Sequence, residues 1–377
     1  MSFYDGLAFF IVLGIGCIPA VILGIREKSA KNYILLLSLV FVVLVFKDTP
    51  LSFLYFAVYM FWEWHVIAVY QWTLGKWGKN KALYHHFLIF ALLPLVIAKC
   101  SGLIGRHWFS FVGISYITFR VLQILIESYD GLIEKSSFAD TINFLIFFPS
   151  LSSGPIDRSK RFEKDFNEIC KKSDYLELLG MGLWKILLGT LYKFVLSDIA
   201  FTILNGLENQ NTVLYLYSYA YIYGFYMFFD FAGYSLMAIG TGNILGVRLP
   251  DNFDKPFISV DIKEFWDRWH ISLSHWFRDF LFSRFMMTAI RGKWFKNRLN
   301  AASAGFIVNM SVMGLWHGLT KDYILYGLYH GVLLAVTEVY QKKCKFYKRN
   351  KQKSWYRVLS WGVTLNLVMF GFLIFSG

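Results

Sequence analysis

The chain alternates between long apolar stretches and short polar connections along nearly its whole length. Most stretches carry few or no charged residues, and they cover residues 7–25, 33–46, 51–72, 83–98, 108–126, 138–151, 176–204, 212–246, 301–316, 322–340 and 356–375. A helix needs about 20 predominantly apolar residues to cross the hydrocarbon core of a bilayer. The pattern therefore predicts an all-α polytopic membrane protein with about ten transmembrane helices.

Composition supports this class of protein. Hydrophobic residues make up 56% of the chain and charged residues only 17%, whereas soluble domains carry about 25% charged residues. No internal repeat or low-complexity tract interrupts the pattern, so we expect a single membrane domain over residues 1–377. The cysteines are dispersed and no metal-ligand spacing occurs, so no metal site is expected.

Charge predicts the topology. The chain has 38 Lys and Arg against 25 Asp and Glu, and its basic residues cluster in the connections 26–31, 76–81, 158–172, 284–298 and 342–357. Basic connections of membrane proteins lie on the cytoplasmic side, so the excess indicates topology and no nucleic-acid partner. Both the N-terminus and the C-terminus are then predicted to be extracytoplasmic.

Two segments break strict alternation across the membrane. Counting spans from the N-terminus places residues 127–136 inside, and a full crossing by 138–151 would put the basic connection 158–172 outside. We therefore predict that 138–151 re-enters the membrane without crossing. Its end is rich in turn-forming residues, and non-helical backbone at membrane depth must face protein or a water-filled cavity. This region is expected to line a cavity.

Residues 258–283 are too charged to cross. Their apolar positions recur at helical spacing: Ile262, Phe265, Trp266, Trp269, Leu273, Trp276, Phe277 and Phe280. This spacing predicts one amphipathic helix. It lies either in the membrane interface or with its polar face on an internal cavity.

His317 is the first candidate catalytic residue. It follows Trp316 at the end of an apolar stretch whose small residues, at 301–305, permit close helix packing. A neutral histidine can take a proton from a hydroxyl near physiological pH, as a general base does. The alternative is a histidine that only packs beside Trp316.

Three other polar features compete with His317. His270 fits a headgroup-facing position on an interfacial helix better than a catalytic one. Asp230 is a lone acid among aromatic residues, so it either pairs with an arginine or orients a base. Residues 153–158, taken alone, predict a turn.

Several of these features together resemble a known family. The chain reads Phe265-Trp266-Asp267-Arg268-Trp269-His270 and, further on, Gly314-Leu315-Trp316-His317-Gly318. Supporting motifs lie at 153–158 with Arg161-Phe162, at 230–235 and at 256–259. This combination resembles the membrane-bound O-acyltransferase family, and within it the bacterial branch that handles D-alanine for teichoic acids. The motif-bearing core covers about 145–331.

The resemblance implies a fold and a site. The fold is a ring of helices around a central funnel or tunnel, with re-entrant and interfacial helices. His317 is then the catalytic histidine and His270 the second active-site position. Asp230, Trp316, Asp267 and Arg268 are candidate supporting residues.

The resemblance also implies the reaction's partners. In the family branch, D-alanine arrives as a thioester on the phosphopantetheine of a small acidic carrier protein in the cytoplasm, so the chain itself would bind no cofactor. The acyl group passes to an extracytoplasmic hydroxyl, with (lipo)teichoic acid of the cell wall as final acceptor. Other proteins of the D-alanylation system and membrane lipid are further expected partners.

A basic turn is the candidate docking surface for the carrier protein. Its residues are Arg291, Lys293, Trp294, Lys296 and Arg298. A positive surface fits an acidic partner. The alternative is that these residues hold the topology through anionic lipid.

Two other functions remain open. An O-acetyltransferase of envelope polysaccharide or peptidoglycan would share the two-histidine layout, although Leu236 stands where acetylating relatives often carry Asp. A non-enzymatic transporter would also have broken segments at membrane depth, but we find no inverted repeat in its support.

Overall fold

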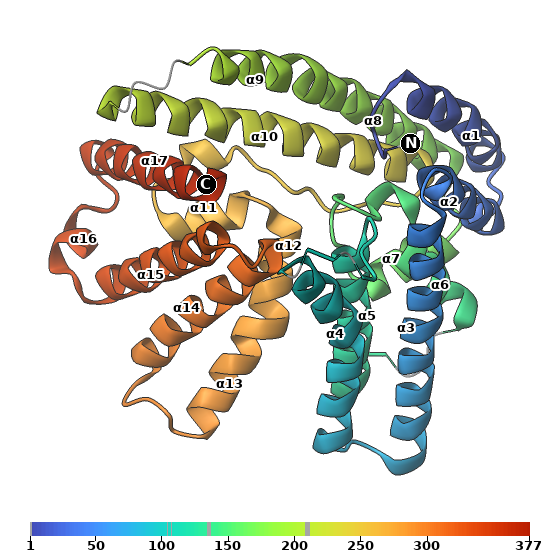
Figure 1. The fold of residues 1–377 in the computed structure, drawn as a ribbon, viewed down its shortest axis with the longest axis horizontal. Helices are drawn as coiled ribbons and strands as arrows, with labels where there is room; N and C mark the ends of the chain where they lie inside the picture. Colours follow the sequence, from blue (N-terminus) through green and yellow to red (C-terminus); the bar gives the residue numbers. More distant parts are fainter. Residues whose placement is uncertain (1, 104, 107, 134–136, 208–211) are drawn as a thin grey trace. The chain divides into compact units, whose positions relative to one another are not determined.

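The computed structural model describes the chain except residues 1, 104, 107, 134–136 and 208–211 (Figure 1). Parts of the predicted connections 99–107, 127–136 and 205–212 thus lie outside the described residues. No β-strand occurs in the described part of the chain, which confirms the all-α prediction. The longer helices in the first two thirds of the chain are α1 (Leu7–Ile25), α2 (Lys31–Phe46), α3 (Pro50–Trp77), α4 (Lys81–Leu103), α5 (Ile114–Asp130), α8 (Lys172–Leu191) and α10 (Val213–Ile244), and the short α9 (Ser197–Asn205) follows α8.

The remaining helices are shorter or lie near the C-terminus. The last part of the chain forms α11 (Ile262–Arg268), α12 (Ile271–Phe277), α13 (Ser283–Arg291), α14 (Arg298–His317), α15 (Lys321–Lys343), α16 (Lys345–Asn350) and α17 (Ser354–Ser376). Short helices α6 (Phe138–Ile146) and α7 (Ser159–Asn167) and the turns η1 (Phe148–Ser150), η2 (Tyr192–Leu196), η3 (Pro256–Ile258) and η4 (Arg278–Phe282) complete the described structure.

Most of the predicted membrane spans are helices of the expected length. Among the described residues, seven helical segments are long and apolar enough to cross a membrane: α1, α3, α4, Lys172–Asn205, α10, α14 and α17. Helix α2 is apolar but shorter, and α5 and α15 occupy the other predicted spans. Leu183, Trp184 and Leu187 on α8 are exposed. Such side chains face lipid tails in a membrane.

The chain forms two compact units, each made of two separate parts of the sequence. Unit 1 comprises Met1–Thr190 and Tyr234–Pro250, and unit 2 comprises Leu191–Gly233 and Asp251–Gly377. The boundaries fall at the end of α8, within α10 and in the connection that follows α10. The single domain over 1–377 and the ring of helices around a funnel stay predictions.

In unit 1, a buried arginine holds the segment predicted to re-enter the membrane. Helix α6 ends at Ile146 and a single helical turn, η1, follows. Arg120 of α5 is 1% exposed. Its Nη1 donates to the carbonyls of Phe144 (2.7 Å) and Leu145 (3.0 Å), and its Nη2 donates to the carbonyl (2.5 Å) and hydroxyl (2.7 Å) of Ser150. The backbone groups released where α6 ends are therefore satisfied by protein, as buried backbone requires.

The segment 153–158, predicted as a turn, follows in the same unit: the chain bends at 153–154 and is irregular from 155 to 158. Asp157 is buried, and its Oδ1 accepts from Nε (2.8 Å) and Nη2 (2.6 Å) of Arg161. Burial raises the pKa of Asp157 to about 6, although the charge of Arg161 opposes the shift. The hydroxyl groups of Ser152 and Tyr234 lie 2.5 Å apart. The hydrogen bonds of Asp157 to Arg161 thus link the segment 153–158 to α7 within unit 1.

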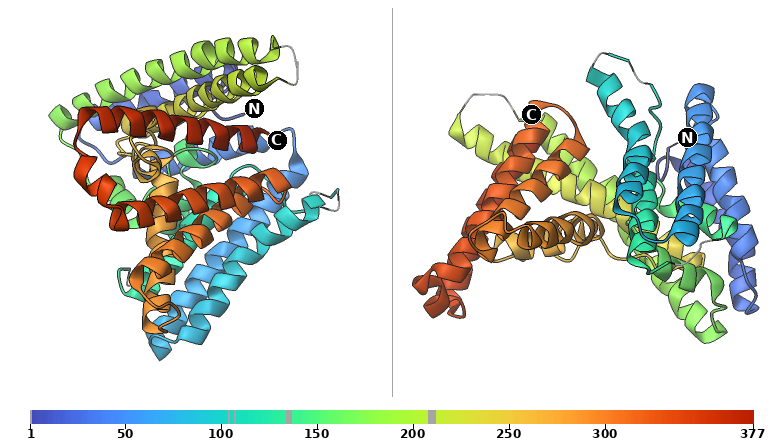
Figure 2. Two further views of the ribbon diagram at one scale, coloured as in Figure 1. Left: turned by 90° about the vertical axis from the view of Figure 1, so that its left-hand side faces the viewer. Right: turned by 90° about the horizontal axis from the view of Figure 1, so that it is seen from below.

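Unit 2 contains both candidate histidines. Helices α14 and α15 pack side by side as an antiparallel pair, and α17 packs on α15 (Figure 2). A Cβ on Gly314 would lie 3.0 Å from the Cα of Gly327, and one on Gly327 would lie 2.5 Å from the carbonyl oxygen of Met310. Only glycine allows this approach of two backbones, as is common between membrane helices.

Candidate active site

A break in the helical backbone shapes the region of His270. Helix α11 begins at Asp261, whose Oδ1 accepts from the N–H groups of Lys263 (2.9 Å) and Glu264 (3.0 Å) and caps the helix. It ends because Trp269 is extended and pairs with Phe253 in an isolated antiparallel bridge. The prediction of one amphipathic helix over 258–283 is therefore wrong, since α11, α12, η4 and α13 divide this stretch.

The predicted apolar face is nevertheless buried. Of the residues at helical spacing, Ile262, Phe265, Trp266, Trp269, Leu273, Trp276 and Phe277 are buried. The helical break leaves this face intact because it changes the direction of the chain at Trp269 and His270, between two short helices that each keep the spacing. The pattern therefore predicted correctly which residues are buried, but it wrongly predicted one continuous helix.

His270 occupies the break in a strained conformation. Its φ of 45° lies in the left-handed region, where non-glycine residues are uncommon and where strain often marks a functional site. The buried Asn252 holds the backbone next to His270. The carbonyl of Asn252 accepts a hydrogen bond from the N–H of Ile271 (2.9 Å). Its side-chain oxygen accepts from the N–H (3.2 Å) and the hydroxyl (2.6 Å) of Ser272.

The imidazole of His270 is inside the protein. It is 4% exposed and packs edge-on against Phe231, with ring centres 4.5 Å apart. Its Nε2 is buried and has no hydrogen-bond partner within the part of the chain that the structure describes. Burial lowers the pKa of His270 well below its usual value, and the nearby His317 lowers it further. A headgroup-facing position on an interfacial helix is therefore wrong for His270.

His317 is the last residue of α14 and is half-buried. The ring of Phe375 stands perpendicular to its imidazole at 5.0 Å, and Tyr323 lies 6.0 Å away. The indole of Trp316 contacts both histidines, with ring centres 4.5 Å from His317 and 6.5 Å from His270. The structure thus brings together three of the predicted site residues: Trp316, His317 and His270.

The glycines of α14 and α15, rather than the small residues at 301–305, determine where His317 lies. Gly314 stands one turn before His317 and packs against Gly327 of α15. Gly305, in the predicted small-residue run, instead faces Phe282, to which a Cβ would come within 2.9 Å. The run permits close packing as predicted, but against η4.

The other predicted supporting residues are occupied by ion pairs. Asp230 pairs with Lys193 of η2, with Oδ1 and Nζ 2.5 Å apart, so its partner is a lysine. Arg268 Nη2 lies 2.9 Å from Glu264 Oε1, and its Nη1 donates to the carbonyl of Asp254 (3.2 Å). Arg268 therefore binds the backbone at Asp254, close to Asn252, which contacts the chain next to His270.

A cavity of about 300 Å³ adjoins this region of unit 2. It is lined by residues of α11, α12, η4, α14 and α15: Lys263, Trp266, Asp267, Ser274, His275, Arg278, Phe282, Phe306, Asn309, Met310, Met313 and Leu334. Asp267 is exposed and lies 3.9 Å from Arg278. Met313 stands one turn before His317 on α14. The lining is thus half apolar and half polar or charged, so it can contact both the apolar and the polar parts of a small molecule.

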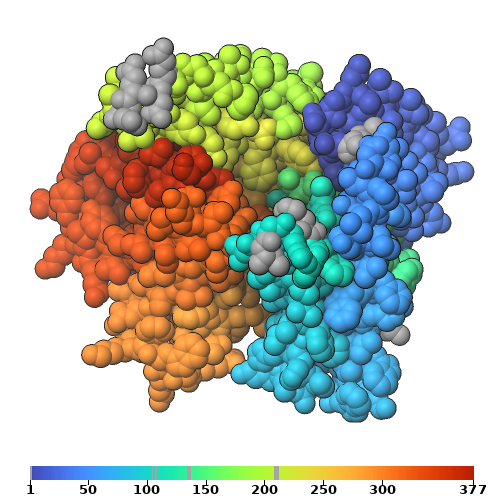
Figure 3. All heavy atoms as spheres, viewed as in Figure 1, coloured from blue at the N-terminus to red at the C-terminus, as the bar shows by residue number. Residues whose placement is uncertain are grey.

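The predicted docking residues form an exposed turn between α13 and α14 (orange in Figures 1 and 3). Arg291, Lys293, Trp294, Lys296 and Arg298 are all exposed. The ring of Trp294 packs on Phe285 at 6.1 Å and so orders the turn.

Sequence reasoning missed Asn252 and Phe375. Asn252 lies in a polar connection with no periodic pattern, and only its pairing with residues 271 and 272 reveals its role. Phe375 looks like any residue of an apolar span. Neither position carries a sequence signal without the tertiary structure.

The fold and the site define a polytopic helical membrane protein with two neighbouring imidazoles, one buried in a strained backbone and one at a helix end. The chain belongs to the membrane-bound O-acyltransferase family, whose sequence pattern matches residues 52–376. It is accordingly a membrane O-acyltransferase.

Named relatives fall into two groups. The teichoic acid D-alanyltransferase of Streptococcus thermophilus is 38% identical over 99% of this chain and 94% of its own length. The teichoic acid D-alanyltransferase of Bacillus subtilis is 38% identical over 100% of this chain and 98% of its own length. A probable alginate O-acetylase of Pseudomonas syringae is 33% identical, but the match covers 70% of this chain and 48% of the relative.

Proposed function

We propose that this chain transfers D-alanine from the phosphopantetheine thioester of a small acidic carrier protein to an extracytoplasmic hydroxyl acceptor, for the D-alanylation of teichoic acid. Near full-length similarity to two teichoic acid D-alanyltransferases supports the acyl group and the final acceptor. The arrangement of His317, Trp316 and His270 carries the chemistry. Other proteins of the D-alanylation system would act beside this chain.

His317 acts as the general base in this proposal. Its neutral imidazole takes the proton of the acceptor hydroxyl while the oxygen attacks the thioester carbonyl. The carbon–sulfur bond then breaks, and the thiolate receives the proton from the imidazolium. A thiol with a pKa of about 8.5 leaves far more readily than an alcohol. The position of His317 at the end of α14 and the partial exposure of its side chain support access for both reactants.

His270 stabilises the tetrahedral intermediate. Because burial lowers its pKa, His270 is neutral, and one ring nitrogen then carries a proton that it can donate. A fixed donor in a water-poor site stabilises a developing oxyanion without reorganisation. The strained backbone held by Asn252 supports this role, because it keeps the ring in one orientation.

The donor reaches the site from the cytoplasmic side. The exposed basic turn with Lys293 and Lys296 attracts the acidic carrier, and the cavity beside Met313 accommodates the end of its pantetheine arm. The N-terminus and C-terminus are extracytoplasmic in this arrangement. Reversal of Lys293 and Lys296 to Glu is expected to weaken carrier capture at low salt. Unchanged capture with unchanged topology would leave these residues a lipid-binding role only.

A transfer assay with two labelled donors tests the proposal. Full-length protein in proteoliposomes receives either carrier loaded with labelled D-alanine or a labelled acetyl donor. The label should be transferred from the D-alanyl carrier and not from the acetyl donor, and this transfer should require His317. Transfer of acetyl alone would establish the O-acetyltransferase alternative. Passage of a solute without any acyl transfer would establish the transporter alternative.

A further inference from the structure

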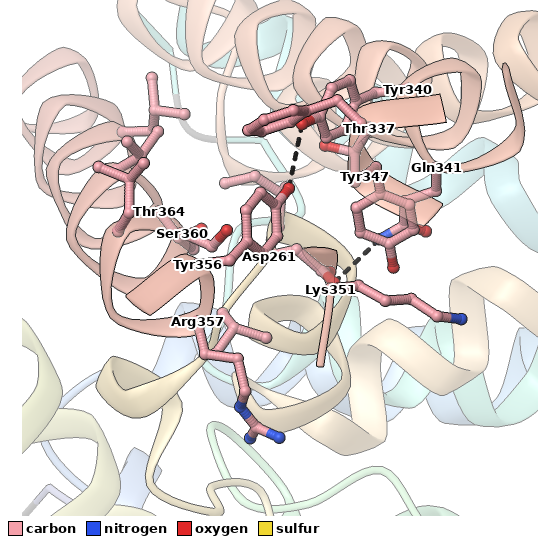
Figure 4. A pocket seen from close by; sticks show the side chains of 16 residues that line it. Asp261, Thr337, Tyr340, Gln341, Tyr347, Lys351, Tyr356, Arg357, Ser360 and Thr364 are labelled. Atoms are coloured by element: carbon pink, nitrogen blue, oxygen red, sulfur yellow. Dashed lines mark hydrogen bonds between the residues drawn. The ribbon is translucent and has the colours of Figure 1, made fainter. Parts of the chain in front are cut away.

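Unit 2 has a second cavity, of about 310 Å³, which shares no lining residue with the cavity beside Met313. It lies between the start of α11 and helices α15, α16 and α17 (Figure 4). The chain around it, residues 342–357, contains many Lys and Arg residues and no acidic residue, and connects two apolar helices. By charge this connection is cytoplasmic, so the cavity is at the inner membrane surface.

The cavity has an apolar wall that continues onto a lipid-facing surface. Ile262, Val363 and Leu367 line it. Next to them on α17, Val358 is 64% and Leu359 56% exposed. Exposed apolar side chains on a membrane helix contact acyl chains, so an occupant of this wall has a hydrocarbon part.

The polar side of the cavity has two cations available. Lys351 and Arg357 are exposed, and within the described part of the chain neither forms an ion pair (Figure 4). In Figure 4 their charged ends lie at the edge of the cluster, away from the bonded pairs. The hydroxyl groups of Tyr340 and Tyr356 lie 3.1 Å apart.

The acid in the cavity, Asp261, forms no ion pair with these cations in the described part of the chain. Its Oδ1 caps α11 through Lys263 and Glu264. Its Oδ2 accepts from Nε2 of Gln341 at 2.9 Å. Both oxygens are thus committed to the protein, whereas Lys351 and Arg357 can bind an anionic group.

We propose that this cavity binds one anionic phospholipid of the inner leaflet, with its phosphate at Lys351 and Arg357 and an acyl chain along Val363 and Leu367. Such a lipid would fasten the junction of α15, α16 and α17 to the membrane surface. The site is independent of the chemistry proposed for His317. If the protein does not bind a lipid here, the proposal for acyl transfer still stands. If the protein does not transfer D-alanine, the proposal for lipid binding still stands.

Native mass spectrometry of the full-length protein in detergent tests the headgroup. Phosphatidylglycerol and phosphatidylcholine with the same acyl chains are added separately. Lys351→Ala with Arg357→Ala should weaken phosphatidylglycerol binding about 30-fold, since each basic residue near an anionic surface contributes about fivefold. Lys348→Ala with Arg349→Ala removes the same charge from α16 outside the cavity and should have little effect. Equal loss in both double variants, or equal binding of both lipids, would overturn the site.

A second pair of variants tests the acyl chain. Val363→Trp fills the cavity and should abolish the phosphatidylglycerol complex, whereas Val358→Trp, on the same helix outside the cavity, should retain it. Displacement of the lipid from the wild-type protein by inorganic phosphate would show an anion site without an acyl chain and overturn the proposal. So would a Lys351/Arg357 double variant that keeps phosphatidylglycerol and loses only binding of the acidic carrier.

Discussion

Two breaks in the helical structure, one in each unit, differ in the hydrogen bonding of the polar side chain that each one buries. After Ile146, the backbone groups released by the end of α6 are bound by the guanidinium of Arg120. At Trp269 and His270, Asn252 and the bridge to Phe253 satisfy the backbone. The first break buries a cation in hydrogen bonds, and the second buries an imidazole whose Nε2 has no partner among the described residues.

In the proposed mechanism, this difference separates a structural break from a catalytic one. A buried polar group without a partner costs free energy, so it persists where something besides stability retains it. The left-handed backbone of His270 adds to that cost. Arg120 also has one buried nitrogen, Nε, without a partner in the described part of the chain, but both of its Nη atoms donate to the protein, so its contacts serve the backbone around it. The two breaks should therefore respond oppositely to substitution, one in stability and the other in catalysis.

The largest expected effect is on folding, at Arg120. Arg120→Ala leaves the carbonyls of Phe144, Leu145 and Ser150 buried without their donor and should cost about 3–5 kcal/mol of stability. Thermal unfolding of the detergent-solubilised protein measures this loss. Arg248→Ala is the control, because Arg248 is exposed and its Nη1 lies as far as 3.8 Å from Asp165, so loss of this long ion pair should cost only about 0–1 kcal/mol. Equal melting of both variants would contradict the structural role of Arg120.

The next effect is on catalysis, at His317. His317→Ala should lower D-alanyl transfer from the loaded carrier by about 100-fold or more, because a positioned base contributes about 10² to 10⁴ in rate. Its unfolding temperature should stay close to that of the wild type, since the ring is half-buried. His86→Ala, which removes an exposed histidine from α4, should keep full activity. Near wild-type turnover of His317→Ala would remove the base from the mechanism.

The sequence predicted most of the helices because spans depend on local composition. The stretch 7–25 is helix α1 residue for residue, and the chain bends at 153–154, within the segment predicted as a turn. The small residues at 301–305 correctly indicated close packing. In each case the property that decides the structure, namely hydrophobicity, turn propensity or side-chain size, belongs to the residues themselves.

The rest depends on contacts between residues distant in the chain. Nothing in the sequence around His270 shows that Asn252 and Phe253 pair with the chain there, so periodicity predicted a continuous helix. Arg120 has no charged neighbour in an apolar stretch that reads as an ordinary span, and its partners are carbonyl groups, which every residue has. The two histidines could be associated by motif resemblance, but only the structure places Trp316 against both.

His270 should give the third effect, and it tests whether the ring or only the backbone matters. Asparagine tolerates the left-handed conformation, so His270→Asn should fold normally while removing the imidazole. We expect turnover to fall about 100-fold, as for loss of one oxyanion donor, with little change in the carrier concentration that gives half-maximal rate. Normal turnover in His270→Asn together with inactivity in His270→Ala would show that the backbone alone is required.

Asn252 should give the smallest effect, and it decides whether the strained backbone serves His270. Asn252→Ala removes the acceptor for the N–H and hydroxyl of Ser272 and should cost about 1–2 kcal/mol of stability. Turnover should fall further than this loss explains, because the ring of His270 is no longer held in one orientation. Asn252→Asp keeps an acceptor oxygen and should restore part of the turnover, whereas Asn300→Ala, at an exposed site on α14, should change neither quantity. If turnover in Asn252→Ala merely follows the amount of folded protein, the break at His270 is structural in the same sense as the break at Arg120, and the contrast between the two units disappears.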